Sequence, residues 1–499
     1  SNSDLAAQKE LKLVTLKRII LAYCGVWADV TTQVQTISPG ERLKVNYSLL
    51  NSGKAPVSVA GIPLQDKDTS LRLALANNEM NSLTQTITIP ENAGHSSPYW
   101  LRSFPEKGLF QVNNVWENTK AENGAALTSV ITFQILNDTF STVLPVRYKA
   151  ADPVKGELYQ PLYIVPQVTI NFPYSNYLFH SSQPKIIPVT VTSSVDSISG
   201  ELIVTAPSGW KLVPAMQRFI LKGRGAQTVI PIEVTPSANA AGGNFTATVK
   251  TNERTYHLGL TTITYDHIPR QHLLRPSDAH LTYEKMTVPK LKIGYIPGAG
   301  DEVADLLKEM DLDVTFISDE QLASASLDQY DAIVTGVRAY NTNEKLQSLH
   351  SKMMAYVAQG GNLIVQYNTN SRVGPLKAKI GPYPFDITRD RVTDETAAVT
   401  ILNPEHSVFN MPNKISSRDF DGWIQERGIY FASDWDTHYQ PLLRMNDPGE
   451  KANDGSLIVA PYGKGNFVYT GLVFFRELPA GIPGAYKLFL NLLALPENK

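Results

Sequence analysis

The spacing of apolar positions changes along this chain, and each pattern predicts a different kind of structure. Residues 4–24 carry leucines at 5, 11, 13, 16 and 21 and isoleucines at 19 and 20, a spacing that predicts a helix. Asp4 can cap its start and Gly25 can end it. Its apolar face is too broad for solvent, so we expect this helix, within residues 1–29, to dock on a neighbouring element.

Short alternating runs follow, and they predict two antiparallel β-sandwiches. The first series, in residues 30–166, includes ERLKVNYSLLNSG and TSVITFQIL, separated by Pro, Gly and Asn turns. The second, in residues 167–266, includes KIIPVTVTSSV and AQTVIPIEVTP and has the length of one immunoglobulin-like sandwich. Residues 267–289 are rich in Pro and His and show no clear period, so we interpret them as a linker.

In residues 290–499, strand-like and helical runs alternate. The apolar runs LKIGYI, DAIVTG and NLIVQY are separated by the helical DEVADLLKEM and by residues 344–358. This alternation predicts a doubly wound, flavodoxin-like α/β domain with a parallel sheet. SLIVAPYGKGNFVYTGL predicts a hairpin and residues 485–495 a closing helix. The expected fold class is therefore multidomain, β plus α/β.

Two of these strands end abruptly in polar and aromatic residues, within Asp331–Asn341 and Gly360–Asn370. Open parallel sheets bind ligands beyond the carboxyl ends of their strands. Arginine recognises carboxylate or phosphate, and aromatic faces beside amides suit a sugar. The alternative, which stays open, is that Arg–Asp and Arg–Glu pairs staple long loops to the sheet. The predicted ligand-binding residues are Arg338, Tyr340, Asn341, Tyr367, Asn368, Thr369, Arg391, Trp423 and Arg476.

Charge and composition exclude several classes of protein. The chain has 45 Lys and Arg against 47 Asp and Glu, a net charge of −2, so we expect no nucleic-acid partner. The apolar stretch Ile19–Val30 is too short to span a bilayer, so we expect no membrane span. Cys24 is the only cysteine. We predict a periplasmic or extracellular location, and a cytoplasmic one stays open.

Several long motifs are spread along most of the chain. They are SPYWL, VKGELYQPLYIVP, VRAYNT, VQYNT, GPYPFDITRDRVT, DFDGWIQERGIYF and FFRELPAGIPGAY. Together they resemble the region that follows the deacetylase domain in large PIG-L (LmbE-like) proteins of Bacteroidetes. APSGWKLVP is similar to the NEW3 sandwich domain that accompanies glycosidases. No AHPDDE-like zinc motif occurs here, so the resemblance covers an accessory part and carries no zinc ligands over.

The C-terminal third resembles the class I glutamine amidotransferase-like superfamily, whose sheet carries a Cys nucleophile at a turn after a strand. The matching turn is Tyr367–Thr369, which has neither Cys nor Ser. His406 is the single candidate for catalysis, since related folds place a histidine near the active site; the alternative is a helix-capping or loop-anchoring role. We predict no metal and no cofactor, because the four histidines within residues 257–280 match no zinc motif.

These observations support competing hypotheses about function. The first is a non-catalytic accessory region of a PIG-L deacetylase that acts on N-acetylated sugars. Its partners would be a carbohydrate and a deacetylase domain in the same or another chain. The second is a sugar-modifying hydrolase or isomerase that uses carboxylates and His406 in the same cleft. The third is purely structural, with the sandwiches as spacers and the last domain as a docking platform.

Overall fold

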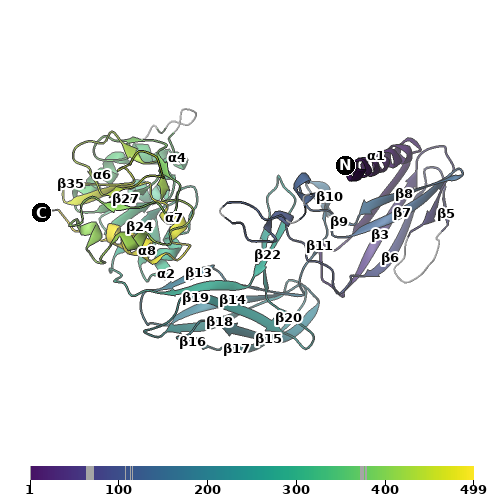
Figure 1. Ribbon diagram of the computed structural model, residues 1–499, viewed down its shortest axis with the longest axis horizontal. Helices are drawn as coiled ribbons and strands as arrows, with labels where there is room; N and C mark the ends of the chain where they lie inside the picture. Colours follow the sequence, from purple (N-terminus) through teal and green to yellow (C-terminus); the bar gives the residue numbers. More distant parts are fainter. Residues whose placement is uncertain are drawn as a thin grey trace.

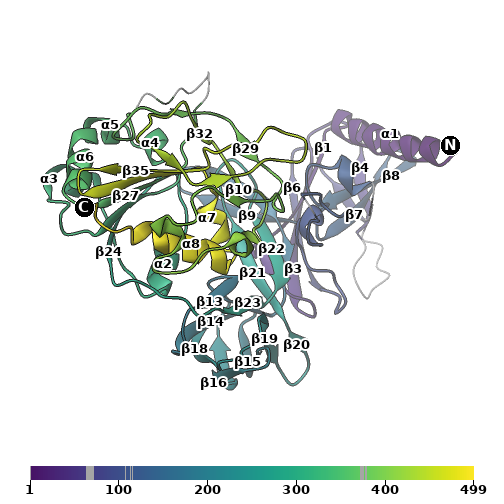
Figure 2. The same cartoon turned by 60° about the vertical axis from the view of Figure 1, so that its left-hand side comes forward.

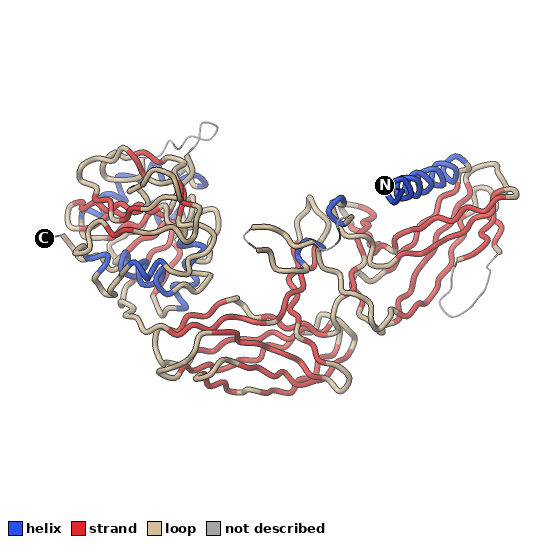
Figure 3. The backbone as a smooth tube through the Cα atoms, in the orientation of Figure 1, coloured by secondary structure: helices blue, strands red, loops and turns tan. Residues whose placement is uncertain are grey.

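The computed structural model describes residues 2–62, 72–106, 108–112, 114, 116–370, 376 and 379–498. The protein is mostly β-sheet and contains multiple sheets. Three units follow one another: an N-terminal unit (α1 to β11), a middle unit (β12 to β23) and a C-terminal unit (β24 to α8). Figure 1 shows the outer units standing at opposite ends of the middle one. In Figure 3, helices gather in the C-terminal unit and at the N-terminus.

The N-terminal unit contains two sheets that enclose one core. Alternate residues of β3 (Leu43, Val45 and Leu49) are buried and pack with Ile131 and Phe133 of the opposite sheet. This alternation is the pattern expected of strands with one buried face. One sheet has the order β10 (Gly156–Pro161), β9 (Arg147–Asp152), β1 (Val26–Thr32), β3 (Arg42–Asn51), β6 (Met80–Thr88). The other has β5 (Leu73–Leu75), β4 (Val57–Gly61), β7 (Thr128–Ile135), β8 (Asp138–Pro145).

Smaller elements complete this unit. They are β2 (Thr36–Ile37), paired with β11 (Tyr163–Ile164), and the short helices η1 (Tyr99–Leu101) and η2 (Glu117–Thr119). The β2–β11 and β1–β9 pairs are parallel, so the unit is not purely antiparallel as predicted. A parallel pair needs a long connection, and many residues separate the partners here.

Helix α1 (Asn2–Tyr23) confirms the predicted N-terminal helix and packs beside β1 and β8. Its docking is only partial: Leu21 is 6% exposed, whereas Leu16 and Ile19 are 51% and 59% exposed. At 3.6 residues per turn, the apolar positions are spread around the helix and cannot all face one neighbour. The helix ends before Gly25, whose φ of +75° and close approach to the Gly53 backbone leave no room for a side chain.

The middle unit is also sandwich-like, with buried residues of both sheets forming one core. One sheet has the order β12 (Val168–Asn171), β14 (Lys185–Ser193), β18 (Gln227–Pro236), β16 (Trp210–Val213). The other has the order β13 (Asn176–Phe179), β23 (Asp278–Tyr283), β19 (Gly243–Lys250), β15 (Ser197–Thr205), β17 (Met216–Lys222). The short β20 (Thr255–Tyr256) pairs with β19. The β13–β23 pair is parallel.

The predicted linker at 267–289 is wrong over much of its length. Strand β23 lies between β13 and β19 and so completes a sheet of the middle unit. β22 (Gln271–Pro276) pairs with β21 (Leu258–Ile263) in a hairpin that rises from the middle unit toward the N-terminal unit (Figure 1). Apolar Ala279, Leu281 and Tyr283 alternate with polar residues along β23, so the segment does carry a short strand signal between Pro276 and Pro289.

The C-terminal unit is built on a seven-stranded sheet. Its order is β25 (Asp313–Phe316), β24 (Lys292–Ile296), β26 (Ala332–Thr335), β27 (Asn362–Gln366), β36 (Gly465–Thr470), β35 (Leu457–Tyr462), β33 (Gln440–Pro441). The first five strands are parallel, and β35 and β36 form the predicted antiparallel hairpin. Three two-stranded sheets lie in the loops: β28 (Asp386–Ile387) with β32 (Ala432–Ser433), β29 (Arg391–Val392) with β31 (Gly428–Ile429), and β30 (Thr400–Ile401) with β34 (Leu443–Arg444).

Both faces of this sheet are buried, which explains why its strands are continuous apolar runs. Along β27, Ile364 joins the core on one face, and Leu363 and Val365 join the core on the other. The first core includes residues of α2 (Val303–Glu309), α7 (Phe474–Glu477), α8 (Pro483–Leu493), η3 (Ser407–Phe409) and η4 (Ser417–Phe420). The second includes residues of α3 (Asp319–Ser324), α4 (Ala339–Thr342), α5 (Lys345–Ser348) and α6 (His350–Ala358). Figure 2 shows the helices around this sheet from a second direction.

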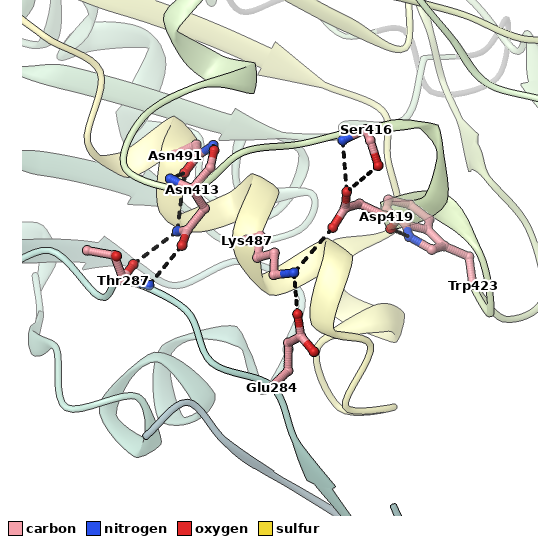
Figure 4. A network of polar contacts seen from close by, with 8 residues as sticks. All are labelled: Glu284, Thr287, Asn413, Ser416, Asp419, Trp423, Lys487 and Asn491. Atoms are coloured by element: carbon pink, nitrogen blue, oxygen red, sulfur yellow. Dashed lines mark hydrogen bonds and ion pairs between the residues drawn. The ribbon is translucent and has the colours of Figure 1, made fainter. Parts of the chain in front are cut away.

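Polar contacts join the segment after β23 to the C-terminal unit (Figure 4). Lys487 of α8 lies 2.5 Å from a Glu284 carboxylate oxygen and 3.6 Å from one of Asp419. Asn413 accepts from the Thr287 backbone N–H at 2.8 Å and donates to the Thr287 carbonyl at 3.0 Å. The segment that connects the middle and C-terminal units is therefore held on the C-terminal unit by paired, directional contacts. Within the described ranges, no helix is long and apolar enough to cross a bilayer.

Candidate functional site

The carboxyl ends of β26 and β27 meet directly. Arg338 follows β26 with φ +60°, and its backbone N–H donates to the Tyr367 carbonyl at 2.9 Å. Left-handed backbone is uncommon for a residue other than glycine, and it turns the chain sharply into α4. The predicted meeting of VRAYN and VQYNT at one sheet edge is therefore present in the structure.

Two asparagines hold this edge in place. Asn341 donates to the Thr369 carbonyl at 2.9 Å and accepts from the Thr369 N–H at 2.8 Å. Asn368, which is fully buried, accepts from the Tyr340 N–H at 3.0 Å and donates to the Gln366 carbonyl at 3.0 Å. The side-chain amides of both residues are thus committed to backbone groups. Asn368 is buried and does not face a ligand surface, which corrects the prediction that it binds one.

A cluster of polar side chains lies at the ends of β24, β26 and β27. The Tyr295 hydroxyl donates to Asp301, and Gln366 Nε2 donates to the Tyr295 hydroxyl and to the Thr335 carbonyl, each at 3.3 Å. Asp301 also accepts from the Val337 N–H at 3.0 Å. These side chains fasten the loops to the strand ends, although none of them forms one of the Arg–Asp or Arg–Glu pairs of the stapling alternative.

Aromatic rings form the exposed part of the site. Tyr367 stacks on Tyr430 with ring centroids 5.5 Å apart and an interplanar angle of 21°, and it lies 5.4 Å from Phe475. All three side chains are only half-buried. Tyr430 follows β31, and Phe475 belongs to α7, so distant loops supply the partners of Tyr367. We call Tyr367, Tyr430 and Phe475 the aromatic cluster.

Two arginines border the aromatic cluster. The Arg476 guanidinium lies 4.9 Å from the Phe475 ring centroid, and its Nε is 3.4 Å from a Glu426 carboxylate oxygen. Arg338 is exposed and has no side-chain hydrogen-bond or ion-pair partner among the described residues. Burial raises the pKa of Tyr367, and the positive charges of Arg476 and Arg338 oppose that rise, so both arginines act electrostatically on this ring. The arrangement is an aromatic surface beside positive charge.

The side chains of three other predicted residues are buried or paired away from the aromatic cluster. Trp423 is 3% exposed, packs on Phe420 and Phe474, and donates its indole N–H to the Asp419 carbonyl, so the prediction that it faces a ligand is wrong. Tyr340 is also buried, and burial raises the pKa of its hydroxyl. Arg391 of β29 pairs with Glu450 at 3.2 Å. Whether a loop aromatic faces the core or the solvent depends on contacts made after the loop has folded.

His406 caps the short helix η3. Its Nδ1 accepts from the Val408 N–H at 3.2 Å, and burial lowers its pKa. This geometry is the one the helix-capping interpretation predicts. The hypothesis that the chain is a sugar-modifying hydrolase or isomerase stays a prediction.

We expect His406→Ala to lower the free energy of unfolding by about 1 kcal/mol, the typical contribution of an N-terminal cap. Chemical denaturation of the variant and the parent measures this. His406→Asn should recover most of the loss, because asparagine also caps helices well. A loss far above that of a cap, or none, would contradict the assigned role.

Glu477 was not predicted from the sequence. It is fully buried in α7, next to Arg476, and its two carboxylate oxygens accept from the Ile424 N–H at 3.2 and 3.1 Å. Burial raises its pKa to about 8, although the Ile424 N–H and Arg427 oppose the rise. Its segment, FFRELPAG, gives no sign that this carboxylate is buried and Arg476 is not.

Among the described residues, no group of three or more His, Cys, Asp or Glu side chains is arranged to hold a metal ion.

Comparisons with known proteins assign no family to this chain. No family model and no curated protein matches it. Similar solved structures include a protein of unknown function from Porphyromonas gingivalis W83 (11% identity, TM-score 0.14, 52% of this chain and 99% of that chain). They also include Escherichia coli alpha-2-macroglobulin activated by porcine elastase (12% identity, TM-score 0.18, 54% of this chain and 23% of that chain). A third is a Bacteroides ovatus GH5 xyloglucanase in complex with a XXXG heptasaccharide. It has 11% identity and a TM-score of 0.16, and the match covers 40% of this chain and 45% of that chain. Scores this low carry no argument about fold or function.

Proposed function

We propose that this chain is a non-catalytic accessory region that binds an acidic carbohydrate for an N-acetyl sugar deacetylase of the PIG-L type. The observation that carries the proposal is Arg338, an exposed guanidinium without a described partner beside the stacked Tyr367 and Tyr430 rings. A sugar ring stacks on such rings through its C–H faces, and a carboxylate on the sugar accepts from the guanidinium. The location remains proposed as periplasmic or extracellular.

We also propose specific fold types for the C-terminal and middle units. We propose that residues 290–499 form a doubly wound domain of the class I glutamine amidotransferase-like type without its nucleophile. The order β25-β24-β26-β27-β36 supports this, since flavodoxin-like sheets have the order 2-1-3-4-5. The middle unit is proposed to be NEW3-like.

A binding role is favoured over catalysis by what the site lacks. The turn Tyr367–Thr369 has no Cys or Ser; Asn341 holds its backbone at Thr369, and Asn368 joins it to the Tyr340 N–H and the Gln366 carbonyl. Covalent catalysis requires a nucleophile within reach of a base. The aromatic cluster and the arginines need no such group to bind a saccharide.

Calorimetric titration of the full chain with glucuronate and with glucose tests the proposal. We expect glucuronate to bind at millimolar concentration and glucose to bind more weakly at the aromatic cluster. Arg338→Ala should weaken glucuronate binding about tenfold, because a hydrogen bond to a charged group is lost. The matched control is Arg218→Ala on β17, an exposed arginine of the middle unit, which should leave binding unchanged. Absence of glucuronate binding at millimolar concentration, or equal affinity in Arg338→Ala, would overturn the proposal.

A further inference from the structure

Strand β6 forms an open edge of the N-terminal unit. It is the last strand of its sheet and pairs with β3 from Arg42↔Thr88 to Leu50↔Met80. No other described strand pairs with its second side. The unpaired side of an edge strand presents backbone N–H and C=O groups that can pair with another chain. The open side of β6 is therefore a surface to which a further strand can be added.

The backbone groups at this open side can be assigned to residues. Opposite residues of antiparallel strands alternate between pairs that exchange backbone hydrogen bonds and pairs that do not. Just after β6, the Ile89 N–H donates toward β3, to the Glu41 carbonyl at 2.8 Å. Just after β3, the Ser52 N–H donates toward β1, to the Gly25 carbonyl at 2.8 Å, which agrees with the same alternation. The residues of β6 that direct their N–H and C=O groups to the open side are therefore Ser82, Thr84 and Thr86.

The other edge strands of the two sandwich-like units are protected, whereas β6 is not. Native edges are protected by charged side chains, prolines, short length or a covering element. Helix α1 packs beside β8, and β10 carries Glu157 and Pro161. β17 carries Arg218 and Lys222, and β16 carries Lys211. The edge strands β5, β12 and β13 have only three or four residues. By contrast, the nine residues of β6, MNSLTQTIT, include no charged residue, proline or glycine.

Even the partial edges of the middle unit carry prolines. β12 ends opposite Thr190 of β14, and Pro188 lies just beyond that point. β16 ends opposite Glu233 of β18, and Pro231 lies just beyond it, directly opposite Pro188. Proline has no backbone N–H, so it hinders the addition of a further strand at such a place. An edge as long as β6 without any such residue is suited to accept a strand.

We infer that β6 pairs antiparallel with β6 of a second copy of this chain, across a two-fold axis at Thr84. In this register Thr84 lies opposite Thr84 of the second copy, and Ser82 lies opposite Thr86, so the backbone groups that face the two open sides meet. Cross-strand pairs of Thr and Ser stabilise a sheet. On the other face, Leu83 and Ile87, which pack on the core of their own unit, lie next to the same residues of the second copy.

Charge does not oppose this pairing. The chain has a net charge of only −2, and Glu79 falls opposite Ile89 of the second copy in this register. Arg42 and Lys44 lie one strand away, on β3. A two-fold interface needs a self-complementary surface, which an uncharged strand provides. One strand pair is smaller than the standard interface of about 1,600 Å², so we expect a reversible dimer with a micromolar Kd.

This inference does not rest on the function proposed for the aromatic cluster. That cluster belongs to the C-terminal unit, which stands at the other end of the molecule from the N-terminal unit (Figure 1). Dimerisation and saccharide binding can therefore fail independently.

Sedimentation velocity of the full chain, from about 1 to about 200 μM, tests the inference. We expect monomer at the low end of this range and dimer at the high end. Thr84→Lys should weaken dimerisation about tenfold, because it places like charges opposite each other at the axis. Thr84→Pro should also weaken it, because it removes an N–H that faces the open side. Both variants should melt close to the parent, since Thr84 is exposed and its backbone N–H does not bond to β3.

Thr128→Lys is the matched control, since it adds the same charge at an exposed threonine of β7, in the opposite sheet. It should dimerise like the parent. Hydrogen–deuterium exchange of the parent provides a test without substitution: the Ser82, Thr84 and Thr86 amides should exchange rapidly in dilute protein and slowly in concentrated protein.

Three results would overturn the inference. The first is a parent that stays monomeric at every concentration, which would leave the edge to a strand of a different protein. The second is dimerisation of both Thr84 variants with the affinity of the parent, or exchange at β6 that does not depend on concentration. The third is an equal loss of the dimer in Thr128→Lys, which would place the interface elsewhere.

Discussion

The free energy of unfolding is expected to fall by about 2–4 kcal/mol as the pH rises from about 5 to about 8, because Glu477 ionises in the unfolded chain but stays protonated while it is buried. Its side chain is fully buried, and its pKa is raised from 4.5 to about 8, chiefly by burial. Between these two pKa values the native state keeps a proton that the unfolded state has released. Stability then falls with pH, and it levels off above the native pKa.

Glu477→Gln isolates this contribution from other titrating groups. The amide oxygen can still accept from the Ile424 N–H, and no charge forms at any pH. We expect the variant to be more stable than the parent at about pH 8 and to be similar at about pH 5. Urea denaturation of both proteins at several pH values measures the difference. Parallel pH profiles for the two proteins would show that Glu477 does not carry the effect.

Asn491→Ala is expected to lower the free energy of unfolding by about 3–5 kcal/mol, because several buried groups lose their partners together. Asn491 is fully buried in α8 and donates to the Val408 carbonyl at 2.8 Å and to the Asn413 carbonyl at 2.7 Å. Its side-chain oxygen accepts from the Asn413 N–H at 2.9 Å. Figure 4 shows that Asn413 continues this network to Thr287.

The change at Asn491 should therefore affect more than α8. Denaturation followed by tryptophan fluorescence measures the loss of stability, and proteolysis between the middle and C-terminal units reports on their contact. Asn252→Ala is the matched control, since Asn252 is exposed on the middle unit and its loss should change stability by less than about 0.5 kcal/mol. Equal stabilities of the two variants would contradict the importance given to the Asn491 network.

The sequence predicted the elements with strong local patterns. Alternation along residues 42–51 became β3, and the apolar run NLIVQY became β27, which is buried on both faces. The turn at Gly463 and Lys464 was predictable because two strand-like runs flank it. In contrast, β23 was missed because its alternating run is short and lies in a segment rich in Pro and His, and its partners, β13 and β19, lie far away in sequence.

The candidate site was predictable only in part. Arg338 and Tyr367 meet because neighbouring parallel strands end at one edge of a sheet, which the strand order alone requires. Phe475 and the stacking role of Tyr430 were not predictable, since long loops bring them to Tyr367. Trp423, from another such loop, enters the core instead.

By itself, the sequence determined the strands and helices with long periodic runs, such as β3 and β27, and that the turn at Tyr367–Thr369 carries no Cys or Ser. These properties depend on residue type and on short-range periodicity. Only the tertiary structure decided which polar side chains are committed to backbone groups, as Asn368 is, and which stay available, as Arg338 does. It also left β6 at an open edge of its sheet. Burial and proximity arise from contacts between residues distant along the chain, and no local pattern records them.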